Sequence, residues 1–128
     1  LYFQHNPFDV QWENMSWGHA VSRDLLHWEQ KDDVLFPDET GTMFSGSGIV
    51  NDRKMLGLPE DAVIFFYTAD GNNNKWSAGK QFTQRIAYST DLLKWEQIDG
   101  VRHAAYINKM AYAAQTYSNT GNLCMTVQ

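Results

Sequence analysis

The chain has 128 residues, of which 43% are hydrophobic and 20% are charged; these ordinary globular values exclude wholesale disorder. Its 10 Lys and Arg against 15 Asp and Glu give a net charge of −5, which argues against nucleic acid as a partner. The single cysteine, Cys124, excludes an internal disulfide framework, and no apolar run reaches the roughly 20 residues of a membrane-spanning helix.

The first 30 residues contain three predicted strands. Leu1–Gln4 has the pattern of a strand end, which the following Pro7 terminates because proline lacks an amide donor. Met15–Arg23 alternates between apolar and small or polar residues and predicts a second strand. Asp24–Leu26 predicts a turn in which the carboxylate accepts hydrogen bonds from the next amides, and Trp28–Gln30 predicts a short third strand.

The middle of the chain contains three further predicted strands. After a predicted loop at Asp32–Thr42 comes Phe44–Asn51, whose Gly and Ser residues indicate close approach of backbone or ligand. Ala62–Ala69 is an almost continuous apolar run and predicts a strand buried on both faces. Asp70–Asn74 then predicts an exposed turn, and Gln81–Ser89 a sixth strand.

A repeat links the two ends of this region. Ser22–Gln30 (SRDLLHWEQ) recurs 67 residues later as Ser89–Gln97 (STDLLKWEQ), identical at seven of nine positions. Each copy predicts a strand, an Asp-Leu-Leu turn and an outer strand that begins at Trp, so one period contains about four strands. Four antiparallel strands per repeat are typical of a propeller blade; a duplicated hairpin in a β-sandwich is the alternative.

The character of the sequence changes after Gly100. Val101–Tyr117 is rich in Ala with a loosely helical spacing, Ser118–Gln128 has no clear pattern, and no third copy of the repeat follows. We therefore expect two segments, 1–100 and a divergent tail at 101–128. The chain also begins within a strand and without Met, which predicts that a further segment belongs before Leu1.

Aromatic residues make up 14% of the chain, with five Trp. Between residues 1 and 29 they mix closely with amide and imidazole groups. Such a mixture suits a surface that stacks on sugar rings and hydrogen-bonds their hydroxyls, although a β-rich core is an equal alternative on composition alone.

Residues 1–100 resemble the N-terminal part of glycoside hydrolase family 32, which contains invertases, levanases and inulinases. The matching motifs, in chain order, are Tyr2–Pro7, Trp12–Ala20, Ser22–Trp28, Phe36–Asp38, Gly41–Ser47 and Gln84–Asp91. The resemblance implies an all-β fold of the five-bladed β-propeller type. This chain would supply about one and a half to two blades of four-stranded antiparallel sheet.

The resemblance also implies a chemistry, namely hydrolysis of fructosyl bonds in sucrose, levan or inulin with retention. Retention requires two carboxyl groups roughly 5–5.5 Å apart. In the family these belong to a Trp-Met-Asn-Asp-Pro-Asn-Gly motif before Gln-His-Asn-Pro and to a later Glu-Cys motif, and an Arg-Asp-Pro motif supplies a stabilising carboxylate. None of these motifs occurs here, so we expect no catalytic residue, no cofactor and no metal site in this chain.

Four residues match the family's fructose-binding positions. Gln4 matches an amide that contacts the sugar, Trp12 an indole that lines the pocket, and Phe44 and Ser45 a pair that closes the same subsite. Each has a structural alternative: a core side chain for Trp12 and Phe44, a strand-end cap for Gln4, and a bulge residue for Ser45. Trp17, Trp28, Trp95 and His19 are predicted to pack in the blades.

Two departures from the family pattern stand out. Glu13 occupies a position where Gly is common, and the tail does not match the family's continuation, which predicts a truncated or misjoined gene product. The leading hypothesis is thus a fragment of a fructan- or sucrose-cleaving enzyme, whose partner is a fructose-containing oligo- or polysaccharide and whose location is secreted, periplasmic or cell-surface. The alternatives are a non-catalytic carbohydrate-binding remnant and, more weakly, a related arabinose- or xylose-polymer hydrolase.

Overall fold

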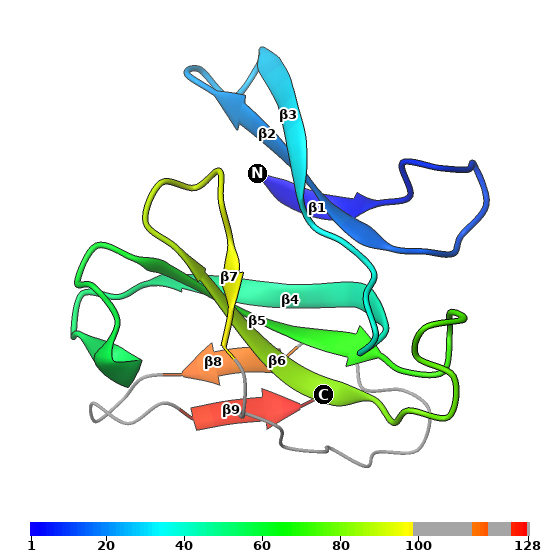
Figure 1. Cartoon of the computed structure of the whole chain (residues 1–128). Coiled ribbons are helices and arrows are strands. Elements are labelled where there is room, and N and C mark those ends of the chain that lie inside the picture. Colours follow the sequence, from blue (N-terminus) through cyan, green and yellow to red (C-terminus); the bar gives the residue numbers. More distant parts are fainter. Residues whose placement is uncertain (99–113, 118–123, 128) are drawn as a thin grey trace.

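Two antiparallel sheets lie one above the other in the computed structural model, which describes residues 1–98, 114–117 and 124–127 (Figure 1). The first sheet contains β1 (Tyr2–His5), β2 (Ser16–Ser22) and β3 (Trp28–Leu35). The second contains β4 (Thr42–Val50), β5 (Val63–Asp70), β6 (Thr83–Ser89) and β7 (Glu96–Gln97), with the short 3₁₀ helix η1 (Met55–Gly57) between β4 and β5. A separate pair, β8 (Ala114–Tyr117) and β9 (Cys124–Val127), lies beside β4 and β5.

Each large sheet is a meander in which consecutive strands pair antiparallel. The sequence repeat places β2 and β3 in the same positions as β6 and β7, so β1 corresponds to β5. The predicted all-β fold and the blade-like meander are confirmed.

The repeated turn has the same hydrogen bonds in both copies. The Asp24 carboxylate accepts the amides of Leu26 and His27 at 2.9 and 2.8 Å, and Asp91 accepts those of Leu93 and Lys94 at the same distances. In each turn one Leu, at position 25 or 92, adopts a left-handed backbone with φ near 64° or 65°. The predicted Asp-Leu-Leu turn is therefore confirmed in both copies.

The main core lies between the two sheets. It consists of Trp17, Leu35, Met43, Phe65, Tyr67, Ala69 and Ala87, with Tyr2, Val34, Val63 and Trp95 packed against it. On the opposite face of the second sheet, Ile64 and Phe66 pack with Ile86. The prediction that the strand at 62–69 is buried on both faces is confirmed.

Two predicted loops are partly strand. The prediction of a loop at Asp32–Thr42 is wrong for its first residues, because β3 continues to Leu35, which pairs with Trp17. Charged residues obscured this strand, and an outer strand tolerates them because one edge faces solvent. The exposed turn expected at Asp70–Asn74 begins later, since Asp70 is buried and pairs with Thr42 at the end of β5.

Two further expectations were wrong. Ala114–Tyr117, part of the segment with helical spacing, forms strand β8, because cross-strand pairing overrides a weak local pattern. The rest of that segment, 101–113, lies outside the described residues. Trp28 was expected to pack, yet it is 44% exposed, whereas Trp17 and Trp95 do lie in or against the core.

Candidate functional site

Gln4 is fixed at the junction between the two sheets. It is partly buried on β1, and its side-chain amide donates a 2.8 Å hydrogen bond to the Met43 carbonyl of β4. The end of the same strand is held across the sheet by His5, whose Nδ1 lies 3.0 Å from the carboxylate of Asp33. One amide hydrogen of Gln4 is thus committed to structure, while its carbonyl oxygen accepts no hydrogen bond within the described chain.

Phe44 and Ser45 lie on an irregular stretch of β4. The register with β5 shifts between Met43 and Gly46, so one extra residue is inserted at this point. Phe44 is partly buried and Ser45 is exposed. Phe44 and Ser45, the predicted subsite pair, are therefore the two residues at the β-bulge. The alternative interpretation of Ser45 as a bulge residue concerns this same bulge.

Trp12 lies on a loop rather than in the core. Its side chain is 66% exposed, which excludes the core alternative, and its ring centroid lies 5.7 Å from that of Phe44. The loop is ordered locally by the Asn6 side chain: its Nδ2 donates to the Gln11 backbone carbonyl at 2.8 Å, and its Oδ1 accepts the Phe8 backbone amide at 3.1 Å. This turn brings Trp12 back over β4.

Phe82 extends this aromatic group, and sequence reasoning missed it. Its ring centroid lies 6.0 Å from that of Phe44 in an edge-to-face arrangement. The only signal in the sequence was an aromatic residue near the beginning of the strand predicted at Gln81–Ser89. Trp12, Phe44 and Phe82 together form a continuous aromatic strip, which offers the apolar faces on which a sugar ring stacks.

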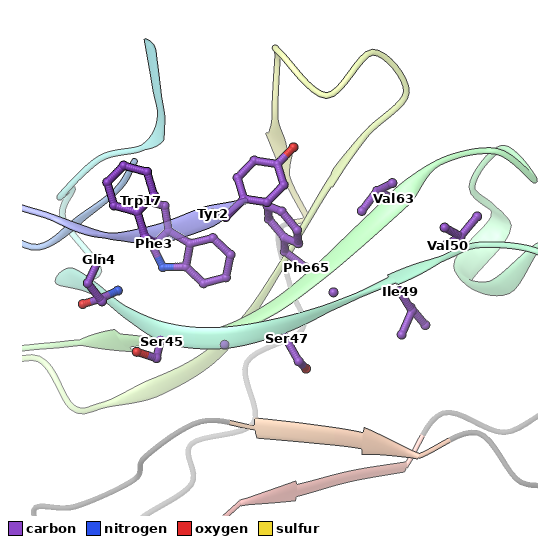
Figure 2. Close-up of a pocket in the computed structure, with 12 residues that line it drawn as sticks. Tyr2, Phe3, Gln4, Trp17, Ser45, Ser47, Ile49, Val50, Val63 and Phe65 are labelled. Atoms are coloured by element: carbon purple, nitrogen blue, oxygen red, sulfur yellow. The ribbon is translucent and has the colours of Figure 1, made fainter. Parts of the chain in front are cut away.

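An open cavity of about 470 Å³ lies between β1 and β4 (Figure 2). Gln4 and Ser45 line it, together with Tyr2, Phe3, Trp17, Gly46, Ser47, Gly48, Ile49, Val50, Val63 and Phe65. Trp12 and Phe44 are not among the lining residues. The structure thus brings the four predicted residues to one region in two pairs, with Gln4 and Ser45 at the cavity and Trp12 and Phe44 in the aromatic strip.

The described residues that line the cavity include amide, hydroxyl and aromatic groups and no carboxylate. Such a set can bind a polyhydroxylated ligand, but it has no group for acid–base or nucleophilic work on a glycosidic bond. Within the described ranges, no three His, Cys, Asp or Glu side chains gather as metal ligands. No helix in this part of the chain is long and apolar enough to cross a membrane.

His19 has a structural role, as the sequence suggested. It is buried on β2 and its ring stacks on Tyr2, with 4.5 Å between the centroids. Burial is the main cause that lowers the pKa of its imidazole, with smaller contributions from the N-terminal charge and Lys31.

The two antiparallel meanders define part of an all-β protein with sheets arranged like propeller blades. The profile of the glycosyl hydrolases family 32 N-terminal domain matches residues 1–120, and the chain belongs to this family. The match runs past residue 100, and the boundary expected there stays a prediction.

Known relatives agree with this assignment. The chain is 40% identical over 94 residues to a levanase of Bacillus subtilis (strain 168) and 35% identical over 114 residues to an extracellular exo-inulinase of Aspergillus awamori. These matches cover 71% and 77% of this chain. The structure of a fructofuranosidase from Schwanniomyces occidentalis complexed with fructose is similar over 98% of this chain, with a TM-score of 0.72 and 26% identity.

The chain spans only a small part of each relative. It covers 13% of the levanase, 21% of the exo-inulinase and 26% of the fructofuranosidase. The similarity therefore concerns one portion of proteins that are several times longer.

Proposed function

We propose that this chain supplies part of the fructosyl-binding subsite of a retaining glycosidase that cleaves fructosyl bonds in levan, inulin or sucrose. The observation that carries the proposal is the position of Gln4 and Ser45 at one cavity beside the strip that contains Trp12 and Phe44. The named relatives, a levanase, an exo-inulinase and a fructofuranosidase, act on this substrate class.

Each side chain has a role that its chemistry allows. The Gln4 carbonyl oxygen and the Ser45 hydroxyl would hydrogen-bond sugar hydroxyls, since neither is fully used by the protein. Trp12 would stack on the apolar face of the furanose, and Phe44 would support Trp12 from below. These groups hold a ring in place and leave the chemistry to carboxylates outside the cavity.

We propose that the 128-residue chain does not hydrolyse fructans by itself. A double displacement needs a nucleophile and an acid–base group, and binding groups cannot replace them. Incubation of the purified chain with levan, inulin and sucrose is expected to release no fructose. Released fructose would contradict this expectation.

Isothermal titration calorimetry on the full chain tests the binding role. Wild type is expected to bind a fructo-oligosaccharide, and Trp12→Ala to weaken that binding by up to about tenfold, because ring stacking contributes of the order of 0.5–1.5 kcal/mol. Trp76→Ala is the matched control, since Trp76 is also exposed, at 55%, but lies on another loop beside Lys75. Equal loss in both variants, or no binding by wild type, would contradict the proposal.

The catalytic role of the longer parent protein needs a separate test. The coding sequence on either side of this segment is expected to contain the missing carboxylate motifs, with Asn-Asp-Pro upstream. We also propose a secreted, periplasmic or cell-surface location for the parent, in line with the extracellular exo-inulinase among its relatives. An upstream sequence without that motif would contradict the enzymatic role.

The second candidate is a non-catalytic carbohydrate-binding protein of the same fold. The absence of carboxylates among the described cavity residues favours it. Saturable binding by the chain, together with flanking sequence that lacks the catalytic motifs, would support this candidate over the first.

A further inference from the structure

The irregular stretch of β4 is held in place by side chains of the other sheet. Thr42 pairs with Asp70 and Met43 with Ala69, but the next pair is Gly46 with Tyr67. Two residues, Phe44 and Ser45, therefore stand opposite one residue of β5. Such a bulge changes the direction of its side chains and leaves backbone groups without their usual ladder partners.

Those backbone groups find partners in the first sheet. The indole Nε1–H of Trp17 donates to the Phe44 carbonyl at 2.9 Å, and the Gln4 amide donates to the Met43 carbonyl at 2.8 Å. The Met43 amide in turn donates to the Met15 carbonyl at 2.7 Å. Three hydrogen bonds from β1, β2 and the residue before β2 thus converge on the beginning of β4. Figure 2 shows Gln4 and Trp17 on the β1 side of the cavity and Ser45 on β4.

Trp17 is well placed to fix this geometry. Its side chain is 5% exposed, and its ring contacts Phe65 and Tyr67, with centroid distances of 4.8 and 6.1 Å. A packed ring holds its single donor in one direction, and a buried backbone carbonyl without a partner would be unfavourable. The indole N–H therefore gives the Phe44 carbonyl a hydrogen-bond partner in the bulged conformation.

Trp95 shows that packing alone does not produce this contact. Its ring stacks on Phe65 at a centroid distance of 3.7 Å, on the same core cluster. Its Nε1 is buried and has no hydrogen-bond partner among the described residues. The two Trp residues share a core but differ in the use of the indole N–H.

We propose that Trp17 is a positioning residue: its indole N–H fixes the Phe44 carbonyl and thereby the bulge that presents Phe44 and Ser45 to the sugar. The part that concerns sugar rests on the function proposed above. The part that concerns the bulge rests on the hydrogen bonds and register alone.

Trp17→Phe in the full chain tests this assignment, because it keeps an aromatic ring and removes the N–H. Trp95→Phe is the matched control, since it removes an N–H that has no partner. In amide NMR spectra, Trp17→Phe is expected to shift the signals of Phe44, Ser45 and Gly46 and to speed hydrogen exchange of the β4 amides there by about tenfold, the effect of one net hydrogen bond. Trp95→Phe is expected to leave these three signals in place.

Equal shifts in the two variants, or none in Trp17→Phe, would overturn the assignment. If Trp17→Phe does not fold, the wild type decides: a scalar coupling across the hydrogen bond between Trp17 Nε1 and the Phe44 carbonyl carbon is expected, and its absence would overturn the assignment.

Calorimetry with a fructo-oligosaccharide separates this proposal from the preceding one. About tenfold weaker binding by Trp17→Phe, with Trp95→Phe within twofold of wild type, supports both proposals. If wild type does not bind, the sugar-binding function fails, while the NMR result still decides whether Trp17 fixes the bulge.

Discussion

Asp24 shows how a single side chain can define a turn. Its carboxylate accepts two backbone amides, and a third contact comes from the Ser22 hydroxyl at 3.2 Å. Asp91 repeats the arrangement. The local sequence was sufficient to predict this turn, because all partners lie within three residues of the aspartate.

Asp24 is expected to titrate at a lower pH than the same residue in a short unstructured peptide. The His27 amide is the main cause that lowers the pKa of Asp24, followed by the His27 side chain and the Leu26 amide. The stabilising effect of the carboxylate is thus complete above the unfolded pKa near 4 and is lost as the pH falls through the folded value.

Carbon-detected NMR titration of the Asp24 carboxyl measures this directly. His27→Ala removes the side-chain contact but keeps the backbone amide, so part of the pKa shift should remain. Arg23→Ala, at an exposed position outside these hydrogen bonds, is the control. An Asp24 pKa equal to that of the peptide would contradict the expectation.

At the scale of the strand, small residues in β4 allow a close approach of backbone. A Cβ on Gly46 would lie 2.0 Å from the Phe66 carbonyl oxygen and 2.9 Å from the Tyr67 Cα. The sequence predicted close approach of either backbone or ligand at this strand. The structure identifies the neighbouring strand β5 as the partner at Gly46.

Gly46→Ala is expected to lower the free energy of unfolding by about 1–3 kcal/mol, because both clashing groups belong to the backbone of β5 and cannot rotate away. Urea denaturation followed by far-UV circular dichroism measures the change. Val50→Ala, on the same strand at a 59% exposed position, is the control and should cost much less. Equal stability of Gly46→Ala and wild type would show that β4 and β5 can separate without cost.

The same repeat gives different packing in its two copies. Trp95 lies against Phe65 and Tyr2, with centroid distances of 3.7 and 5.6 Å, while Trp28 stays 44% exposed. The difference arises because the first sheet lies against the face of the second sheet on which Trp95 packs. Tyr2 of the first sheet contacts Trp95 there. The repeated local sequence therefore specified the same turn but could not specify which residues pack against the Trp.

At the scale of the molecule, one aromatic cluster joins the two sheets. Phe65 on the second sheet contacts Tyr2 and Trp17 of the first sheet and Trp95 of its own. It is 3% exposed. Burial of this ring is the clearest single contribution to the association of the sheets.

Phe65→Ala is expected to cost about 3–5 kcal/mol, the range for large-to-small changes at buried aromatic positions. A loss of this size approaches the total stability of a small domain, so the variant should unfold at much lower urea than wild type. Phe8→Ala, at a 73% exposed position, is the control. Similar midpoints for both variants would show that the cluster does not hold the sheets together.

The sequence by itself determined most of the strands in residues 1–98, the repeated turn and the family, because these depend on alternation, local hydrogen bonds and ordered motifs. The tertiary structure decided how the site is built. Gln4 meets the backbone of β4 across 39 residues and Trp17 meets it across 27, and neither contact has a local signal. The exposure of Trp12, the place of Phe82 and the bulge of β4 have the same origin, since each depends on which surfaces two distant strands present to one another.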